Sequence, residues 1–105
     1  MYAALSVRKL KPGSFDDWRK GWEPDEWPET VTKAFILRNL ANPDEVVALG
    51  LSDASLDELN ELRDDSSWQE GEARRQERMA PHVESETASG FYEVVEVVVP
   101  AAAAH

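Results

Sequence analysis

The sequence predicts an α+β fold in which an antiparallel sheet of about four strands carries its helices on one face. Stretches with a strand pattern and stretches with helical periodicity follow each other in the order strand, helix, strand, strand, helix pair, strand. The second and third strands are joined by the short turn Asn42-Pro43-Asp44. A connection this short predicts that these two strands are antiparallel neighbours.

The first strand is predicted over residues 2–10 and the first helix directly after it. In the strand the odd positions, Leu5 and Val7 among them, are the more apolar and are predicted to be buried. Ser14 and Asp17 have the spacing of a capping box at the start of the helix. An apolar stripe at i, i+3 and i+7 follows, and it ends at Trp22, two residues before a proline.

Trp27 lies in the acidic loop over residues 23–30, which is an unusual place for a tryptophan. Its indole either covers a gap in the core, which fits the high average burial of tryptophan, or forms a lid over the mouth of a pocket.

The two hairpin strands are predicted over residues 31–40 and 45–51, and both are apolar on both faces. This composition indicates a sheet that is covered on both sides. A helix capped by Asp53 or by Ser55, with Glu58 completing a box, comes next.

A longer helix is predicted from about residue 67 to residue 80, where Pro81 ends it. The last strand is predicted over residues 91–99, between Gly90 and Pro100. Residues 1–100 are therefore expected to form one domain, with a flexible tail over residues 101–105.

This order of elements is that of a ferredoxin-like sandwich. Its helices cover one sheet face, and the valine-rich last strand leaves apolar side chains for the other face. Two copies that stack these faces would bury them, so a homodimer that closes an α/β barrel is predicted.

Composition argues against several classes of partner. The 105 residues include 21 acidic and 11 basic ones, a formal charge of −10, which repels nucleic acids and anionic membranes. There is no cysteine, and a lone histidine within the domain cannot build a structural zinc site, so no metal is expected. The start of the chain has neither a signal peptide nor a membrane span, so a cytoplasmic protein is expected.

Candidate site residues come from the long helix and the segment after it. Trp68, Glu72, Arg75 and Met79 fall on one helical stripe, where Glu72 and Arg75 have the i, i+3 spacing of an ion pair. Their charged heads either reach water along the edge of the core or face a cavity, where Arg75 would hold an anionic oxygen and Glu72 would position it or accept a proton. His82 is either a general base or a hydrogen-bonded loop residue.

The chain resembles the dimeric α/β-barrel superfamily, and within it the antibiotic-biosynthesis-monooxygenase-like domains. The resembling segments are RKLKPGSFDDWRKGWEP (8–24), RNLANPDEVVALGLSD (38–53) and EARRQERMAPHV (72–83). The resemblance implies a two-subunit barrel in which each subunit has its own cavity between sheet and helices. Some members of this superfamily oxidise electron-rich aromatic molecules with oxygen and without a bound metal or flavin.

Other members degrade haem with a first-strand asparagine, a helix tryptophan and a histidine ligand. Trp68 and His82 could match the last two, but residues 2–10 contain no asparagine and Pro81 interrupts the spacing. No cofactor is therefore expected.

Three function classes remain open at this stage. They are a cofactor-independent oxygenase of a small aromatic substrate, a non-catalytic small-molecule-binding module, and an interaction module whose dimer is the functional unit. The pocket in the first two would be lined by Trp22, Trp27, Trp68 and Met79.

Overall fold

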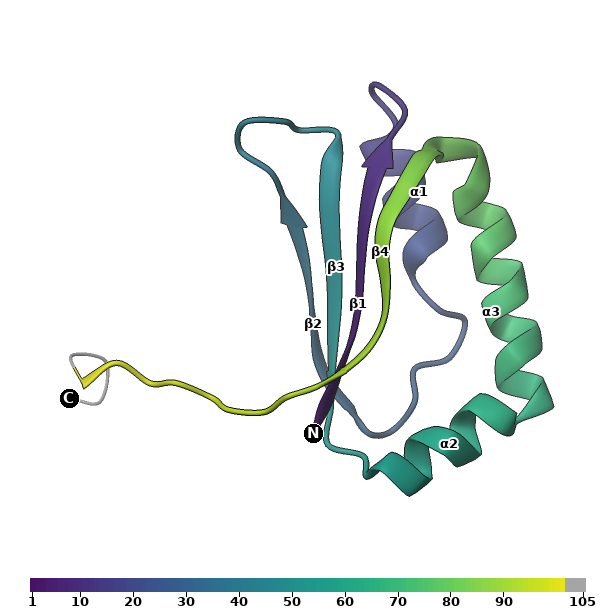
Figure 1. Cartoon of the computed structure of the whole chain (residues 1–105). Coiled ribbons are helices and arrows are strands. Elements are labelled where there is room, and N and C mark those ends of the chain that lie inside the picture. Colours follow the sequence, from purple (N-terminus) through teal and green to yellow (C-terminus); the bar gives the residue numbers. More distant parts are fainter. Residues whose placement is uncertain (102–105) are drawn as a thin grey trace.

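The computed structural model describes residues 1–101 of the chain, and it shows one sheet with helices on one side (Figure 1). The predicted tail over residues 101–105 lies outside the described residues, apart from Ala101. The elements are β1 (Tyr2–Leu10), α1 (Phe15–Trp22), β2 (Val31–Arg38), β3 (Glu45–Ser52), α2 (Leu56–Asp64), α3 (Ser66–Met79), the short 3-10 helix η1 (Ala80–His82) and β4 (Val83–Glu93).

The strand order in the sheet is β2-β3-β1-β4, and every neighbouring pair is antiparallel. The hairpin of β2 and β3 stands at one edge, and β1 lies between β3 and β4. Together with helices on a single face, this order confirms the predicted ferredoxin-like α+β sandwich.

The main core lies between the sheet and helices α1 and α3. It is built around Trp18, which is fully buried, with Leu10, Val46 and Met79 against it. The two helices approach closely at Gly21, where a Cβ atom would lie 3.1 Å from the backbone of Arg78. A side chain at position 21 would therefore press on the backbone of α3, which favours glycine at this crossing.

The helix ends show which capping predictions hold. Ser55 and Glu58 form the predicted capping box of α2, since each side chain bonds the backbone N–H of the other residue. The box predicted for Ser14 is wrong, because its side chain makes no cap hydrogen bond. The carboxylate of Asp65 accepts from Trp68 N at 2.8 Å and so starts α3. As predicted, α3 ends next to Pro81.

The prediction that odd positions of the first strand are buried holds for Ala3 but is wrong for the rest of the strand. From residue 6 onward the even positions Ser6, Arg8 and Leu10 are the buried ones, on the side of the helices. Leu5 and Val7 lie on the other, open face and are only half-buried. The more apolar side of β1 thus belongs to the uncovered face of the sheet.

The last strand is also placed wrongly by the sequence. It runs over Val83–Glu93 rather than over residues 91–99, because β1 offers pairing partners only from Leu10, opposite Val83, to Tyr2, opposite Glu93. One further bond, from Val94 N to Met1 O at 3.1 Å, ends the ladder. Residues 94–100 then continue as an arm without regular structure, and Val95 in it is 87% exposed.

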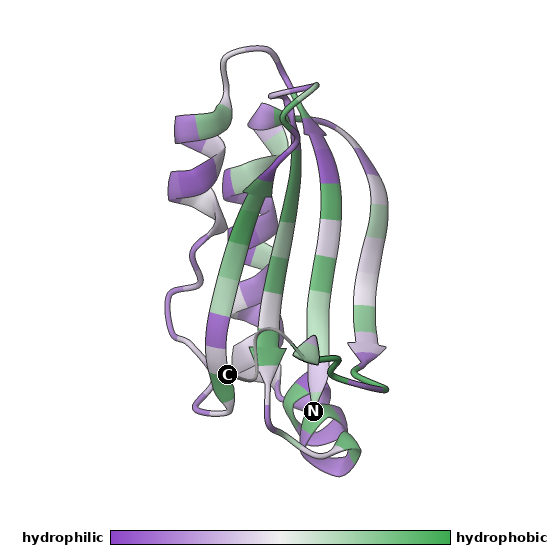
Figure 2. Cartoon of the chain, turned by 90° about the vertical axis from the view of Figure 1, so that its left-hand side faces the viewer, coloured by the Kyte–Doolittle hydropathy of each residue, from purple (hydrophilic) through white to green (hydrophobic). Residues whose placement is uncertain are grey.

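The open face of the sheet is apolar. Figure 2 shows this face with hydrophobic bands on neighbouring strands. Phe35 and Leu37 on β2 are 42% and 49% exposed there, and they pair with Leu49 and Val47 on β3. No helix in the described part of the chain is long and apolar enough to cross a membrane.

Candidate functional site

A cavity of about 250 Å³ lies between the sheet and α3, on the side of the sheet that the helices cover. Its walls combine aromatic side chains with polar and charged ones. The lining includes Tyr2, Ser6, Arg8, Trp22, Trp27, Trp68, Glu72, Arg75, Ser89 and Phe91. This is the region beside Trp68 in which the sequence predicts a pocket.

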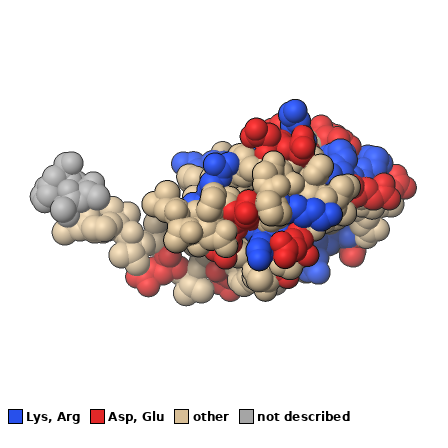
Figure 3. Space-filling model, turned by 90° about the horizontal axis from the view of Figure 1, so that it is seen from above, with Lys and Arg blue, Asp and Glu red and all other residues tan. Residues whose placement is uncertain are grey.

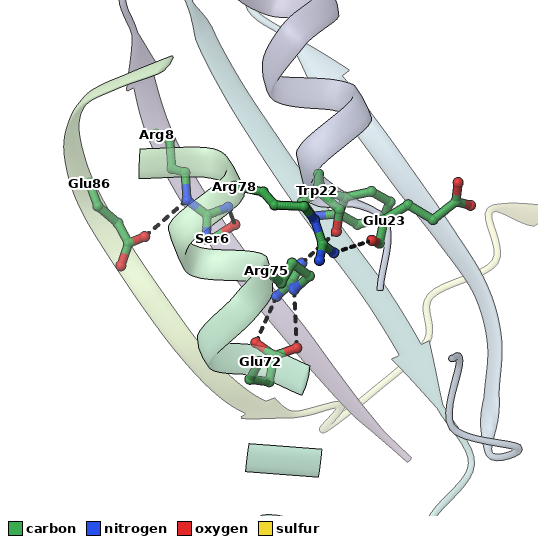
Figure 4. A network of polar contacts seen from close by, with 8 residues as sticks. All are labelled: Ser6, Arg8, Trp22, Glu23, Glu72, Arg75, Arg78 and Glu86. Carbon is green, nitrogen blue, oxygen red and sulfur yellow. Dashed lines mark hydrogen bonds and ion pairs between the residues drawn. The ribbon is translucent and has the colours of Figure 1, made fainter. Parts of the chain in front are cut away.

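Glu72 and Arg75 both line the cavity, and their predicted i, i+3 ion pair is confirmed. Arg75 donates from Nε and Nη2 to the two carboxylate oxygens of Glu72, each at 3.0 Å. Its Nη1 donates to a carbonyl oxygen at 2.9 Å, that of Trp22, the last residue of α1 (Figure 4). All three nitrogens of Arg75 therefore have a partner: two bond Glu72 within α3, and Nη1 joins α3 to α1.

Arg8 on β1 contributes a second guanidinium to the cavity wall, and its side chain is only 4% exposed. Its Nε donates to Glu86 at 3.0 Å, and its Nη1 donates to the hydroxyl of Ser6 at 2.6 Å (Figure 4). Burial lowers the pKa of Arg8; the carboxylate of Glu86 opposes this shift and the charge of Arg75 adds to it. The guanidinium remains charged, because arginine stays protonated in proteins.

The pairing of Arg8 with Glu86 depends on an irregularity in β4. The β1–β4 register shifts between Val7, which lies opposite Ala88, and Arg8, which lies opposite Glu86, so Thr87 is an extra residue on β4. An extra residue reverses which side chains point to which face. Without this bulge, Glu86 would point to the open face, away from Arg8.

Three tryptophans form much of the apolar wall of the cavity. Trp22 and Trp27 meet edge to face with ring centroids 5.7 Å apart, and Trp27 is 40% exposed. Trp27, Trp68 and Pro28 also line a second hollow, of about 340 Å³, on the outer side of the α1–β2 loop. Acidic side chains gather in this outer groove, namely Asp25, Glu26, Glu29 and Asp65. Trp27 thus lies between the cavity and an acidic groove.

Two of the predicted site residues lie elsewhere. Met79 is almost fully buried in the main core and does not line the cavity. His82 lies in η1, at the far end of α3 from Trp68, which is roughly 20 Å away at 1.5 Å per helical residue. Its carbonyl oxygen accepts from Lys11 N at 2.9 Å. Met79 packs into the main core because α1 and the sheet meet at its end of α3. Helical periodicity places Met79 on the same stripe as Trp68 but does not show where α1 packs.

Arg8 is the site residue that sequence reasoning missed. It was assigned to the exposed side of the strand because the odd positions are more apolar. A signal was present nonetheless, since Arg8 shares its side of the strand with Tyr2, Ser6 and Leu10. Among the described residues, no three potential metal-ligating side chains come together.

Comparisons with known proteins show which fold the chain shares with solved structures. No known protein family matches the sequence, and no curated protein is similar enough to match. Solved structures do match. A candidate antibiotic biosynthesis monooxygenase from Chloroflexus aurantiacus superposes with a TM-score of 0.64 at 13% identity, over 93% of this chain and 96% of that one. The chain has the ferredoxin-like fold of the antibiotic-biosynthesis-monooxygenase-like proteins.

Two further structures share this fold. One is another candidate antibiotic biosynthesis monooxygenase, from Nitrosomonas europaea, with a TM-score of 0.62 at 11% identity, covering 91% of this chain and 100% of that one. The other is an uncharacterised NIPSNAP domain protein from Burkholderia xenovorans, with a TM-score of 0.54 at 20% identity, covering 97% and 96%. At identities this low the similarity concerns the fold alone. The chemistry of the site has to be argued from its own residues.

Proposed function

We propose that this protein binds a small aromatic molecule in the cavity between its sheet and α3. The observation that carries the proposal is the cavity itself, where three tryptophans and a few polar groups converge. Ligand sites in proteins are usually apolar hollows with a small number of placed polar groups. At about 250 Å³ the cavity has the volume of roughly eight water molecules, which suits a ligand of one to three rings.

A second candidate function is cofactor-independent oxygenation of such a molecule. The description of two structural relatives as monooxygenase candidates favours it. In an anthrone-like substrate, O₂ would convert a ring CH₂ to C=O and release one water, so the substrate supplies the electrons. Glu72 would take the ring proton, and its ion pair with Arg75 opposes this step because it stabilises the charged carboxylate. Binding requires no proton transfer to Glu72, and for this reason it is the primary proposal.

One experiment separates the two candidates. Anthrone and a hydroquinone are titrated into the protein while tryptophan fluorescence, thermal unfolding and oxygen uptake are recorded. Binding alone should quench fluorescence and raise the unfolding temperature, since a ligand of the native state stabilises it. Oxygen uptake that disappears in Glu72→Gln but not in the exposed Glu77→Gln would support the second candidate function, catalysis that depends on Glu72. Absence of any fluorescence or stability change with a panel of one- to three-ring aromatics contradicts the primary proposal.

We also propose that the protein is a homodimer joined through the open face of the sheet. Strands about 4.8 Å apart with eight residues at 3.3 Å each give this face a flat area of roughly 500 Å². A stable interface buries roughly 800 Å² per partner, so the face alone is small. The arm over residues 94–100 leaves the sheet on the side away from the helices (Figure 1), where it would reach a copy stacked on this face.

A further inference from the structure

The two arginines that line the cavity differ in how many of their nitrogens are hydrogen-bonded. Every nitrogen of Arg75 has a partner. In Arg8 only Nε and Nη1 are bonded, and Nη2 has no hydrogen-bond partner within residues 1–101. Its ionic partner Glu86 is 40% exposed, whereas Arg8 is 4% exposed. Arg8 is thus a buried cation that lines the cavity and whose pairing within the described residues is incomplete.

The hydroxyl of Ser6 adds a donor at the same place. Its oxygen accepts the hydrogen bond from Arg8 Nη1, so its own hydrogen is free to be donated. Ser6 also lies opposite Ser89 in the β1–β4 ladder, and both serines line the cavity. A guanidinium nitrogen beside a hydroxyl donor matches an oxygen anion, because a hydrogen bond between a charged donor and an anionic oxygen is stronger than one between neutral groups.

We propose that the ligand of this cavity is an aromatic monoanion, a carboxylate or an enolate, whose oxygen binds Arg8 Nη2 and the hydroxyl of Ser6. This inference rests on the proposed binding function and specifies its ligand class. The ring would lie against the tryptophan wall formed by Trp22, Trp27 and Trp68. The ligand oxygen would complete the hydrogen bonding of a charge that is already desolvated, which favours the anion over a neutral molecule of the same shape.

The acidic groove outside Trp27 opposes the entry of an anion but not its binding. Its carboxylates are screened over about 8 Å at physiological ionic strength, whereas the contact with Arg8 is direct and buried. Added salt should therefore speed the association of an anion, because it screens the repulsion at the mouth.

The test compares 1-naphthoate with 1-naphthamide, which have the same ring and differ in charge. Dissociation constants are measured by calorimetry and tryptophan fluorescence for the wild-type protein and for the double variant Arg8→Met, Glu86→Gln. Removing both partners avoids leaving an unpaired charge at the site. The wild type should bind naphthoate on the order of tenfold to a hundredfold more tightly than naphthamide. The double variant should lose this preference and bind naphthamide as the wild type does.

The control is the double variant Lys9→Met, Glu84→Gln. It removes one exposed ion pair between the same two strands, outside the cavity, and should keep the preference for naphthoate. Equal affinities of the two ligands for the wild type would overturn the inference, and this comparison does not depend on any variant folding. A preference that survives without Arg8 would overturn it as well. Binding of neither ligand would reject the binding function together with the inference.

Discussion

At the scale of single residues, the two arginines that line the cavity have different roles. Arg75 connects α3 to the last carbonyl of α1 and to Glu72, so it is part of what holds the cavity wall in place. Arg8 is held by Glu86 and Ser6, lines the cavity, and has no partner for Nη2 among residues 1–101. The sequence leaves Arg75 either at the edge of the core or as the holder of an anionic oxygen, and the hydrogen bonds favour Arg8 for the second role.

The structural task of Arg75 can be measured. Arg75→Met should lower the free energy of unfolding by about 2 kcal/mol, because it leaves the half-buried carboxylate of Glu72 and the Trp22 carbonyl without their partner. Arg74→Met is the matched control. Its ion pair with Asp25 is more than half exposed on both sides, so it should change stability by less than about 0.5 kcal/mol. Urea unfolding at a fixed protein concentration measures both. Equal changes in the free energy of unfolding for the two substitutions would contradict the stabilising role of Arg75 between α1 and α3.

At the scale of elements, the cavity exists because α1 and α3 meet closely at one end. Gly21 permits this contact with the backbone of Arg78. Further along α3, the α1–β2 loop and Trp68 separate from the sheet and leave the lined space.

The close crossing gives a prediction with a built-in comparison. Gly21→Ala should destabilise the protein by about 1–3 kcal/mol, since the added methyl would lie 3.1 Å from backbone atoms of Arg78 and α3 would have to shift to restore an ordinary contact. Gly71→Ala should instead stabilise it by about 0.5–1 kcal/mol, because this position in α3 has only the flexible end of Arg74 near it and alanine favours helix. Thermal unfolding should move in opposite directions for the two variants. A shift of the same sign and size would show that the crossing tolerates a methyl group.

At the scale of the whole molecule, charge and apolar surface are distributed differently. Acidic and basic side chains are interspersed on the end of the body seen in Figure 3. The open sheet face and the arm carry exposed apolar side chains, among them Phe35, Leu37 and Val95. Contiguous apolar surface of this kind marks an interaction site.

The dimer proposal predicts that Phe35→Glu produces a monomer, because it would bury a charge at the centre of the interface. Leu56→Glu is the control, since Leu56 is also an exposed apolar residue, at 71% against 42% for Phe35, and lies on α2, away from this face. Analytical ultracentrifugation at micromolar concentration should show dimers for the wild type and for Leu56→Glu. A truncation after Glu93 should weaken the dimer, because it removes the arm. A monomeric wild type would refute the proposal.

The sequence by itself determined the order of elements, most of their bounds, the hairpin, the α2 cap and the Glu72–Arg75 pair. These features depend on local periodicity, turn residues and neighbours three or four positions apart. Tertiary structure alone decided the rest. The face of β1 that meets the helices, and with it the burial of Arg8, depends on which sheet side α1 and α3 cover. Glu86 reaches Arg8 only through the bulge at Thr87, and β4 ends at Glu93 only because β1 ends opposite it. Pairing between strands that are distant in the sequence sets each of these outcomes, and a single sequence does not encode such pairing in its local pattern.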